Sequence, residues 1–166
     1  SGNDTKVAAR GVNLLNGRIG RCAKIDSKST LIVPFDYKTD DRSFFLDCHL
    51  NLEDAITNEN QLLVFESIAN SGGMSLTATT DKGIAKLKLG FHFENGRKKH
   101  VEFTAISNAW FHLNVTGSKG YVKVSIDGSE VSSFPLSHSE KVVLGDFVFG
   151  GSGSAKFKLD ELTTGH

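Results

Sequence analysis

Apolar and polar residues alternate along most of the chain, which is the pattern of β-strands that turn one face to a core. The run 44–52 is a clear case, because its even positions are apolar and its odd positions after Phe45 are polar. This parity puts Cys48 on the inner face. Strands are likewise predicted at 86–94, 100–104, 111–115, 122–126, 130–134, 141–149 and 157–162. The chain is therefore predicted to be all-β.

Two dipeptides predict tight turns between these strands. Asn95-Gly96 lies between two alternating runs and predicts a two-residue type I′ turn, which needs a positive φ at both residues. Residues 86–104 are therefore expected to form one long hairpin, with the basic residues 97–99 at its tip. Asp127-Gly128 predicts a second tight turn. Short strands separated by such turns are typical of a sandwich or a barrel.

Length and composition favour a single domain. The 166 residues include two Pro, and they contain no internal repeat, Pro-rich linker or block of like charge. A chain of this size buries about 70% of its unfolded surface on folding. Residues 1–10 are predicted to be a flexible N-terminal segment or a remnant of cloning, and residues 11–166 to be one domain. The segment 52–57 is predicted to be a loop, with one helical turn as the alternative.

The charge balance excludes two classes of partner. Nineteen basic residues face nineteen acidic ones, so the chain has no net charge with which to attract a phosphate backbone or an anionic membrane. No apolar run approaches the roughly 18 residues of a membrane-spanning helix. Neither nucleic-acid binding nor membrane insertion is expected. The charges are spread along the sequence, so no concentrated charged patch is expected either.

Residues 110–128 carry a family resemblance. Trp110 opens an alternating run that ends in Thr116, and after a glycine turn a strand is closed by Asp127-Gly128. This segment resembles the central signature of the laminin G-like, concanavalin A-like jelly-roll family. Residues 20–34 and 157–162 resemble the opening and closing strands of that family, so the likeness covers about residues 11–164. It implies an antiparallel two-sheet jelly roll with a concave face and rim loops.

The sequence offers little for catalysis. Asp160 and Glu161 form the only acidic pair within a predicted strand, and adjacent strand residues point to opposite faces. They are therefore not expected to act as the acid and nucleophile of a glycosidase. No nucleophile elbow, zinc-binding helix or phosphate-binding loop is present. The domain is predicted to be non-enzymatic.

Binding residues are predicted from outward positions of the strands. His49, His92, His100 and His112 all lie on polar faces and would line one concave surface if their strands shared a sheet. The alternative is four separate solvated histidines, with the strands divided between two sheets. Trp110, Tyr37 and Tyr121 are suited by type to stack on a sugar ring, although Trp110 could instead be buried. The predicted ligand-binding residues are His49, His92, Glu94, Trp110, His112 and Tyr121.

One loop is a candidate calcium site, and the two cysteines are a candidate disulfide. Calcium is the ion that the family resemblance implies, and Asp36, Asp40 and Asp41 offer carboxylate ligands in one loop. Basic residues interleave with them, so a solvated loop is the alternative, and no cofactor is certain. Cys22 and Cys48 have opposite parity, which favours two thiols, with a bridge left open if the first strand lies at an edge.

These observations lead to one functional expectation with two rivals. The domain is expected to be a recognition module of a larger extracellular, cell-surface or periplasmic protein that binds a carbohydrate or protein ligand. The rivals are a structural or assembly domain without a ligand, and an appendage of a polysaccharide-processing enzyme. The oligomeric state stays open.

Overall fold

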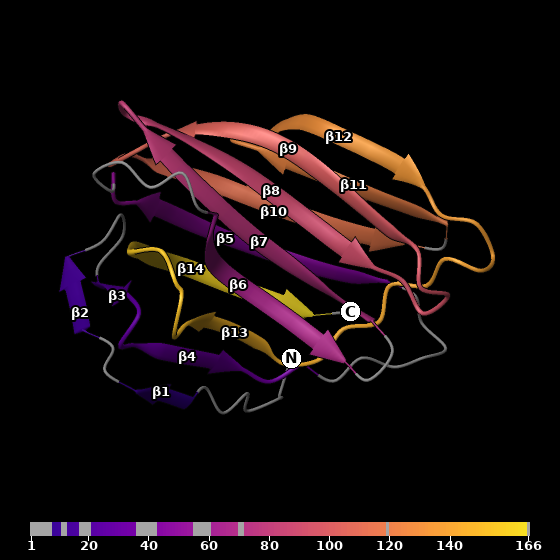
Figure 1. Cartoon of the computed structure of the whole chain (residues 1–166), viewed down its shortest axis with the longest axis horizontal. Coiled ribbons are helices and arrows are strands. Elements are labelled where there is room, and N and C mark those ends of the chain that lie inside the picture. The colour runs from indigo at the N-terminus through magenta and orange to yellow at the C-terminus, as the bar shows by residue number, and fades with distance from the viewer. Residues whose placement is uncertain are drawn as a thin grey trace.

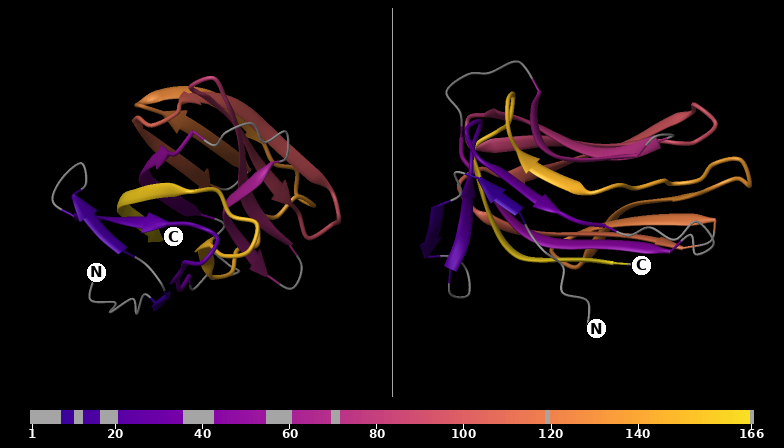
Figure 2. Two further views of the ribbon diagram at one scale, coloured as in Figure 1. Left: turned by 60° about the vertical axis from the view of Figure 1, so that its left-hand side comes forward. Right: turned by 90° about the horizontal axis from the view of Figure 1, so that it is seen from below.

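The computed structural model describes residues 8–10, 13–16, 21–35, 43–54, 61–69, 72–118 and 120–165. These residues form two seven-stranded sheets, whose pairings between strands are all antiparallel, packed face to face as two layers (Figures 1 and 2). The predicted all-β, antiparallel two-sheet jelly roll is confirmed. Within the described part of the chain, no helix has the length and hydrophobicity needed to span a bilayer.

Each sheet contains a run of consecutive strands, and most of the other connections cross between the two sheets. Sheet A has the order β1 (Ala8–Arg10), β4 (Thr30–Val33), β13 (Phe147–Gly150), β6 (Leu62–Ala69), β7 (Gly72–Asp81), β8 (Ile84–His92) and β9 (Lys98–Ile106). Sheet B has the order β12 (Ser129–Pro135), β11 (Tyr121–Ile126), β10 (Trp110–Ser118), β5 (Phe44–Leu52), β14 (Phe157–Gly165), β3 (Arg21–Ile25) and β2 (Asn13–Asn16). The longest runs are β6 to β9 in sheet A and β10 to β12 in sheet B.

The core lies between the sheets and is rich in phenylalanine. The Phe65 ring packs against Phe147 and Phe149, at centroid distances of 6.0 and 5.3 Å. Burying one such side chain stabilises the fold by about 1.5–3 kcal/mol. The largest fully buried side chains include Phe65, Phe91, Phe93, Phe147, Phe149 and Phe157. The excess of Phe in the sequence is therefore core filling.

Parity predicted the inner face of the strands correctly. In β5 the even positions are buried and the odd positions are partly or fully exposed. Cys48 is fully buried, as predicted, and burial raises the pKa of its thiol. Cys22 is buried as well, and these two described residues form no disulfide.

The two predicted tight turns differ. Asp127 and Gly128 have φ values of 51° and 81°, so the β11–β12 turn has the positive φ pair expected of type I′. The hairpin at Asn95-Gly96 is confirmed, since β8 and β9 pair along their whole length. The predicted type I′ turn is wrong, because of Asn95 and Gly96 only Gly96 has a positive φ. The Gly96 N–H donates a hydrogen bond to the Phe93 carbonyl at 3.0 Å. A three-residue loop with a left-handed third residue joins the strands.

Other differences concern where strands begin and end. Of the predicted strand 141–149, only Phe147 onward is a strand, because the Ser67 hydroxyl bonds both the N–H and the carbonyl of Gly145, at 2.9 and 2.7 Å. The first ten residues contribute β1, which pairs with β4. Asp36, Tyr37, Asp40, Asp41 and the segment 55–60 lie outside the described residues.

Candidate functional site

The outer face of sheet A is hollowed beside its central strands. In register, Ser75 of β7 lies opposite Gly90 of β8, and Gly73 lies opposite His92. Small residues thus occupy the middle of the face. They adjoin a cleft of about 570 Å³, here called the hollow. Its lining is Glu66, Ile68, Ala69, Gly72, Gly73, Met74, Ser75, His92, Phe93, Glu94, Gly96 and Lys98.

The glycines of this face differ in whether neighbouring atoms leave room for a side chain. A Cβ on Gly72 would lie 2.6 Å from the His92 carbonyl oxygen, and one on Gly73 would overlap the Ser67 carbonyl, so the backbone there leaves no room. A Cβ on Gly90 would meet only the Ser75 hydroxyl, at an ordinary 3.6 Å. Glycine inside a strand destabilises it by about 0.5–1 kcal/mol relative to alanine. Packing therefore does not explain why Gly90 is a glycine.

The hollow has the mixed lining of a ligand cleft. His92, Glu94 and Lys98 are exposed at its rim, and Glu66 is partly buried on the opposite side. The Ile68 side chain, 66% exposed, adds apolar surface. Planar imidazole and carboxylate groups at such a rim can exchange hydrogen bonds with the hydroxyls of a sugar. Two of the predicted ligand-binding residues, His92 and Glu94, therefore lie at one cleft.

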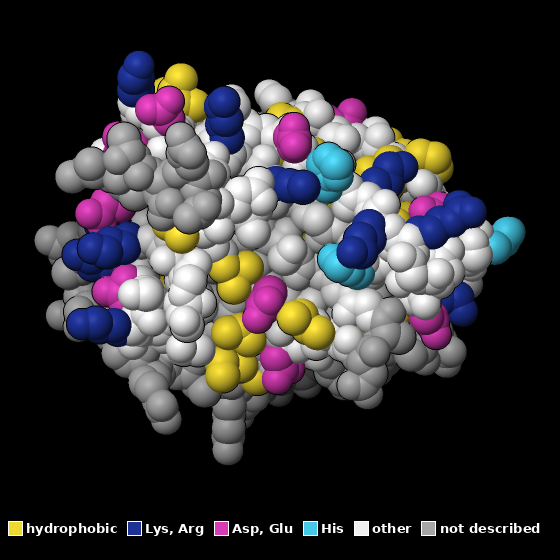
Figure 3. All heavy atoms as spheres, viewed as in Figure 1, with side chains coloured by type: hydrophobic (Ala, Val, Ile, Leu, Met, Phe, Trp, Pro, Cys, Tyr) yellow, Lys and Arg dark blue, Asp and Glu magenta, His cyan; other side chains and the backbone are white. Residues whose placement is uncertain are grey.

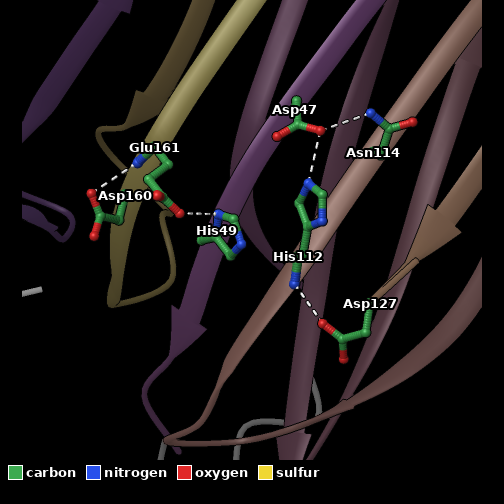
Figure 4. A network of polar contacts seen from close by, with 7 residues as sticks. All are labelled: Asp47, His49, His112, Asn114, Asp127, Asp160 and Glu161. Atoms are coloured by element: carbon green, nitrogen blue, oxygen red, sulfur yellow. Dashed lines mark hydrogen bonds and ion pairs between the residues drawn. The ribbon is translucent and has the colours of Figure 1, made fainter. Parts of the chain in front are cut away.

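The outer face of sheet B is built differently (Figure 4). His112 on β10 lies opposite His49 on β5, and their rings stack with centroids 4.5 Å apart and planes 11° from parallel. Asp47 Oδ2 lies 2.7 Å from His112 Nε2 and accepts a 2.8 Å hydrogen bond from the Asn114 amide. On the other side of the stack, His49 Nδ1 lies 2.9 Å from a Glu161 carboxylate oxygen. We call these five residues the sheet B network.

Two neighbouring carboxylates hold the backbone around this network. Asp127 Oδ1 accepts the His112 backbone N–H at 2.9 Å, which ties the β11–β12 turn to β10. Asp160 Oδ1 accepts the N–H of Glu161, also at 2.9 Å. The register of β14 shifts after Asp160, and Glu161 has a φ of 50°. Strict alternation fails there, yet the two carboxylates point away from each other, so they do not form a paired acid site (Figure 4).

The predicted binding residues are divided between opposite faces. His92, His100 and Glu94 belong to β8, β9 and the loop between them, whereas His49, Trp110, His112 and Tyr121 belong to sheet B. The prediction that all four histidines line a single concave surface is therefore wrong. The alternative, in which their strands are divided between two sheets, is correct. The histidines of sheet B are not isolated, because each has a carboxylate partner. Trp110 is half-buried, and Tyr121 is 41% exposed.

Sequence reasoning missed Ser75 in the hollow and Gly90 beside it. Gly90 and Ser75 occupy outward positions inside strands, and a glycine at such a position was an available signal. Among the described residues, no group of three or more His, Cys, Asp or Glu is arranged to hold a metal ion. The calcium candidates Asp36, Asp40 and Asp41 lie outside those residues, so calcium stays a prediction.

Comparisons with known proteins add a fold relationship. No protein-family model matches the sequence, and no curated protein matches it. Among solved structures, the botulinum neurotoxin serotype D binding domain matches 98% of this chain with a TM-score of 0.77 and 18% identity. The binding domain of botulinum neurotoxin DC in complex with SialylT matches 98% of the chain, with a TM-score of 0.77 and 15% identity.

A third match is a botulinum neurotoxin type C structure, described by the dependence of cell entry on interaction with two ganglioside molecules. It covers 96% of this chain, with a TM-score of 0.75 and 15% identity. The chain spans only 43–44% of the length of these three structures. At such identities the likeness establishes the β-sandwich fold.

Proposed function

We propose that this domain is a non-catalytic carbohydrate-recognition module that binds its glycan in the hollow of sheet A. The observation that carries the proposal is Gly90. This residue weakens the middle of a paired strand, and no neighbour requires it to lack a side chain. It lines a depression of about 220 Å³ that shares Ser75, His92 and Lys98 with the hollow, so a ligand that extends from the hollow passes over it. Glycine within a strand marks sites where another group approaches the backbone closely.

The chemistry of the rim fits a sugar. His92, Glu66 and Glu94 supply hydrogen-bonding groups of both polarities, and Ile68 supplies apolar surface for the C–H groups of a pyranose ring. One structure with this fold is a neurotoxin binding domain in complex with SialylT, and another belongs to a neurotoxin whose cell entry depends on interaction with two ganglioside molecules, which supports glycan recognition. The resemblance of residues 110–128 to laminin G-like domains supports the same proposal. Such a ligand suits an extracellular or cell-surface protein.

A glycan array followed by calorimetry with the tightest binder tests this function. Gly90→Leu places a side chain in the open space beside the Ser75 hydroxyl, so we expect it to weaken binding at least about tenfold, a loss of about 1.4 kcal/mol. Thr116→Leu is the matched control, because Thr116 lies on the outer face of sheet B. Circular dichroism melting of both variants separates lost binding from lost folding.

Three outcomes decide the proposal. Loss of binding in folded Gly90→Leu, with Thr116→Leu unchanged, supports the hollow as the glycan site. Equal binding by wild type and Gly90→Leu overturns the site. A blank array, together with a concentration-dependent oligomer in light scattering, overturns glycan recognition in favour of an assembly domain.

A further inference from the structure

The hollow continues into a groove along the outer face of β8. Two shallower depressions, of about 220 and 280 Å³, follow it toward the start of the strand. The first shares Ser75, His92 and Lys98 with the hollow, and the two depressions share Gln61 and Lys88 with each other. A ligand longer than the hollow could therefore lie along β8, across several strand positions.

Basic side chains follow this groove. Lys86 and Lys88 lie two residues apart on the outward face of β8, a spacing of about 7 Å. Lys98 of β9 lies opposite His92, at the hollow. Among the residues that the structure describes, no carboxylate lies within 4.0 Å of the amino group of any of these three lysines. Three cationic groups are thus available to a ligand.

One carboxylate lies in the groove with these lysines. Glu102 is the cross-strand partner of Lys88 and lines the same depression as Lys86 and Lys88. Its ionic contact is with His100 Nε2, at 3.8 Å. Glu66 and Glu94 lie at the hollow, away from the depression that holds Lys86. Figure 3 shows dark blue Lys and Arg side chains and cyan histidines over the centre and right-hand side of this face, along β8 and β9, with a magenta acidic side chain among them. The two depressions are lined by Lys86, Lys88, Lys98 and Lys99 against Glu102, so basic side chains outnumber acidic ones there although the chain is neutral.

We propose that this groove binds an extended acidic oligosaccharide. A neutral, hydroxyl-bearing sugar occupies the hollow beside Glu66 and Glu94, and the carboxylates or sulfates of the following sugars face Lys88 and Lys86. This inference rests on the proposed function and adds the ligand class. A nucleic acid fits less well, because the domain has no net positive charge and the hollow carries two carboxylates that would repel phosphate.

Calorimetry with three hexasaccharide probes tests the ligand class. The probes are an oligogalacturonate, its carboxyl-reduced neutral counterpart and a heparin-derived hexasaccharide whose uronate carboxyl groups have been reduced, so that carboxylate and sulfate are tested separately. Each acidic probe carries one neutral sugar at its end for the hollow. The test variant is Lys86→Gln/Lys88→Gln. The matched control is Lys123→Gln/Lys158→Gln, which removes two lysines from sheet B.

We expect an acidic probe to bind more tightly than the neutral one, and the difference to shrink as salt is raised. The test variant should lose about tenfold in affinity for the acidic probe, since exposed ion pairs are individually weak. Its affinity for the neutral probe, and the affinities of the control variant, should not change. The probe that responds, oligogalacturonate or heparin hexasaccharide, identifies carboxylate or sulfate as the recognised group.

Other outcomes overturn this inference without touching the proposed function. Tighter binding of the neutral probe, still sensitive to Gly90→Leu, would retain the hollow and reject the acidic ligand. Equal losses in the test and control variants would show attraction to lysine in general and would reject the groove. If neither these probes nor the glycans of the array bind, the proposed function itself fails, and the ligand class fails with it.

Discussion

The outer faces of the two sheets have the same strand geometry and use their polar residues in opposite ways. On sheet B, Asp47, His49, His112, Asn114 and Glu161 bond to one another across three strands. On sheet A, small residues lie at the centre, and the polar side chains stand around a cleft. Polar groups that are satisfied by one another stabilise a sheet, whereas polar groups around a hollow are available to a ligand. The contrast supports the proposal that sheet A is the binding face.

The largest predicted effect compares a glycine from each sheet. In Gly117→Ala, the new methyl group would overlap the Phe44 ring, so the substitution should destabilise the fold by about 3 kcal/mol. Gly90→Ala should instead stabilise the fold by about 0.5–1 kcal/mol, because alanine is more favourable than glycine inside a strand and its methyl group displaces no neighbouring atom. Urea unfolding midpoints measure both. A destabilised Gly90→Ala would show that packing requires this glycine and would remove the main support for the hollow.

The second prediction compares one polar residue from each face. Asp47→Ala leaves the His112 ring and the Asn114 amide without their acceptor, which should cost about 2 kcal/mol. Ser75→Ala at the hollow should change stability by less than about 0.5 kcal/mol. Thermal melting with matched buffers measures the difference. Similar losses of stability in both variants would mean that the polar residues of the two faces contribute equally to the stability of the fold.

A third prediction concerns backbone strain beside the network. Glu161 and Lys82 both have a φ of 50°, which is unfavourable by about 1–2 kcal/mol for a residue other than glycine. At each position the glycine variant should therefore be about 1 kcal/mol more stable than the alanine variant. Glu161→Ala should lose a few tenths of a kcal/mol more than Lys82→Ala, because it also removes the contact with His49. Equal losses would show that this contact contributes nothing to stability.

Whether the sequence predicts a structural feature correctly depends on whether that feature is local. Parity along one strand is local, and it correctly put Leu46, Cys48 and Leu50 inside. The sheet to which a strand belongs depends on crossovers elsewhere in the chain. His92 and His112 have the same outward parity, yet β8 and β10 lie in opposite sheets, so one predicted surface became two.

The hollow is a non-local feature as well. It joins a depression at Ser75, and Gly90 in that depression lies opposite Ser75 through the register of the β7–β8 hairpin. Lys82-Gly83, with φ values of 50° and 83°, forms the turn between β7 and β8 and was a readable signal for this pairing. At Asn95-Gly96 the dipeptide located the turn, but the length of the loop decided its type. A polar pattern alone therefore predicts strands more surely than it predicts sites.

The smallest predicted effect concerns the connections that join the two faces. Asp26, between β3 and β4, accepts hydrogen bonds from the Lys28 N–H and the Ser29 hydroxyl, which lower the pKa of its carboxyl group. The Ser137 N–H likewise lowers the pKa of Glu140, between β12 and β13. A carboxyl group whose pKa is lowered by folding stabilises the protein above its unfolded pKa of about 4, and this stabilisation is lost as the pH falls through the folded pKa.

Asp26→Asn and Glu140→Gln should therefore flatten the loss of stability below about pH 5, while changing little at pH 7. An asparagine or glutamine oxygen can still accept the same hydrogen bonds but does not titrate. Urea midpoints at pH 7, 5, 4 and 3 measure the slopes, and Glu140→Gln is compared with Glu130→Gln on the exposed edge strand β12. If the variants and wild type lose stability in parallel, acid sensitivity arises within the sheets rather than in the turns that connect their two faces.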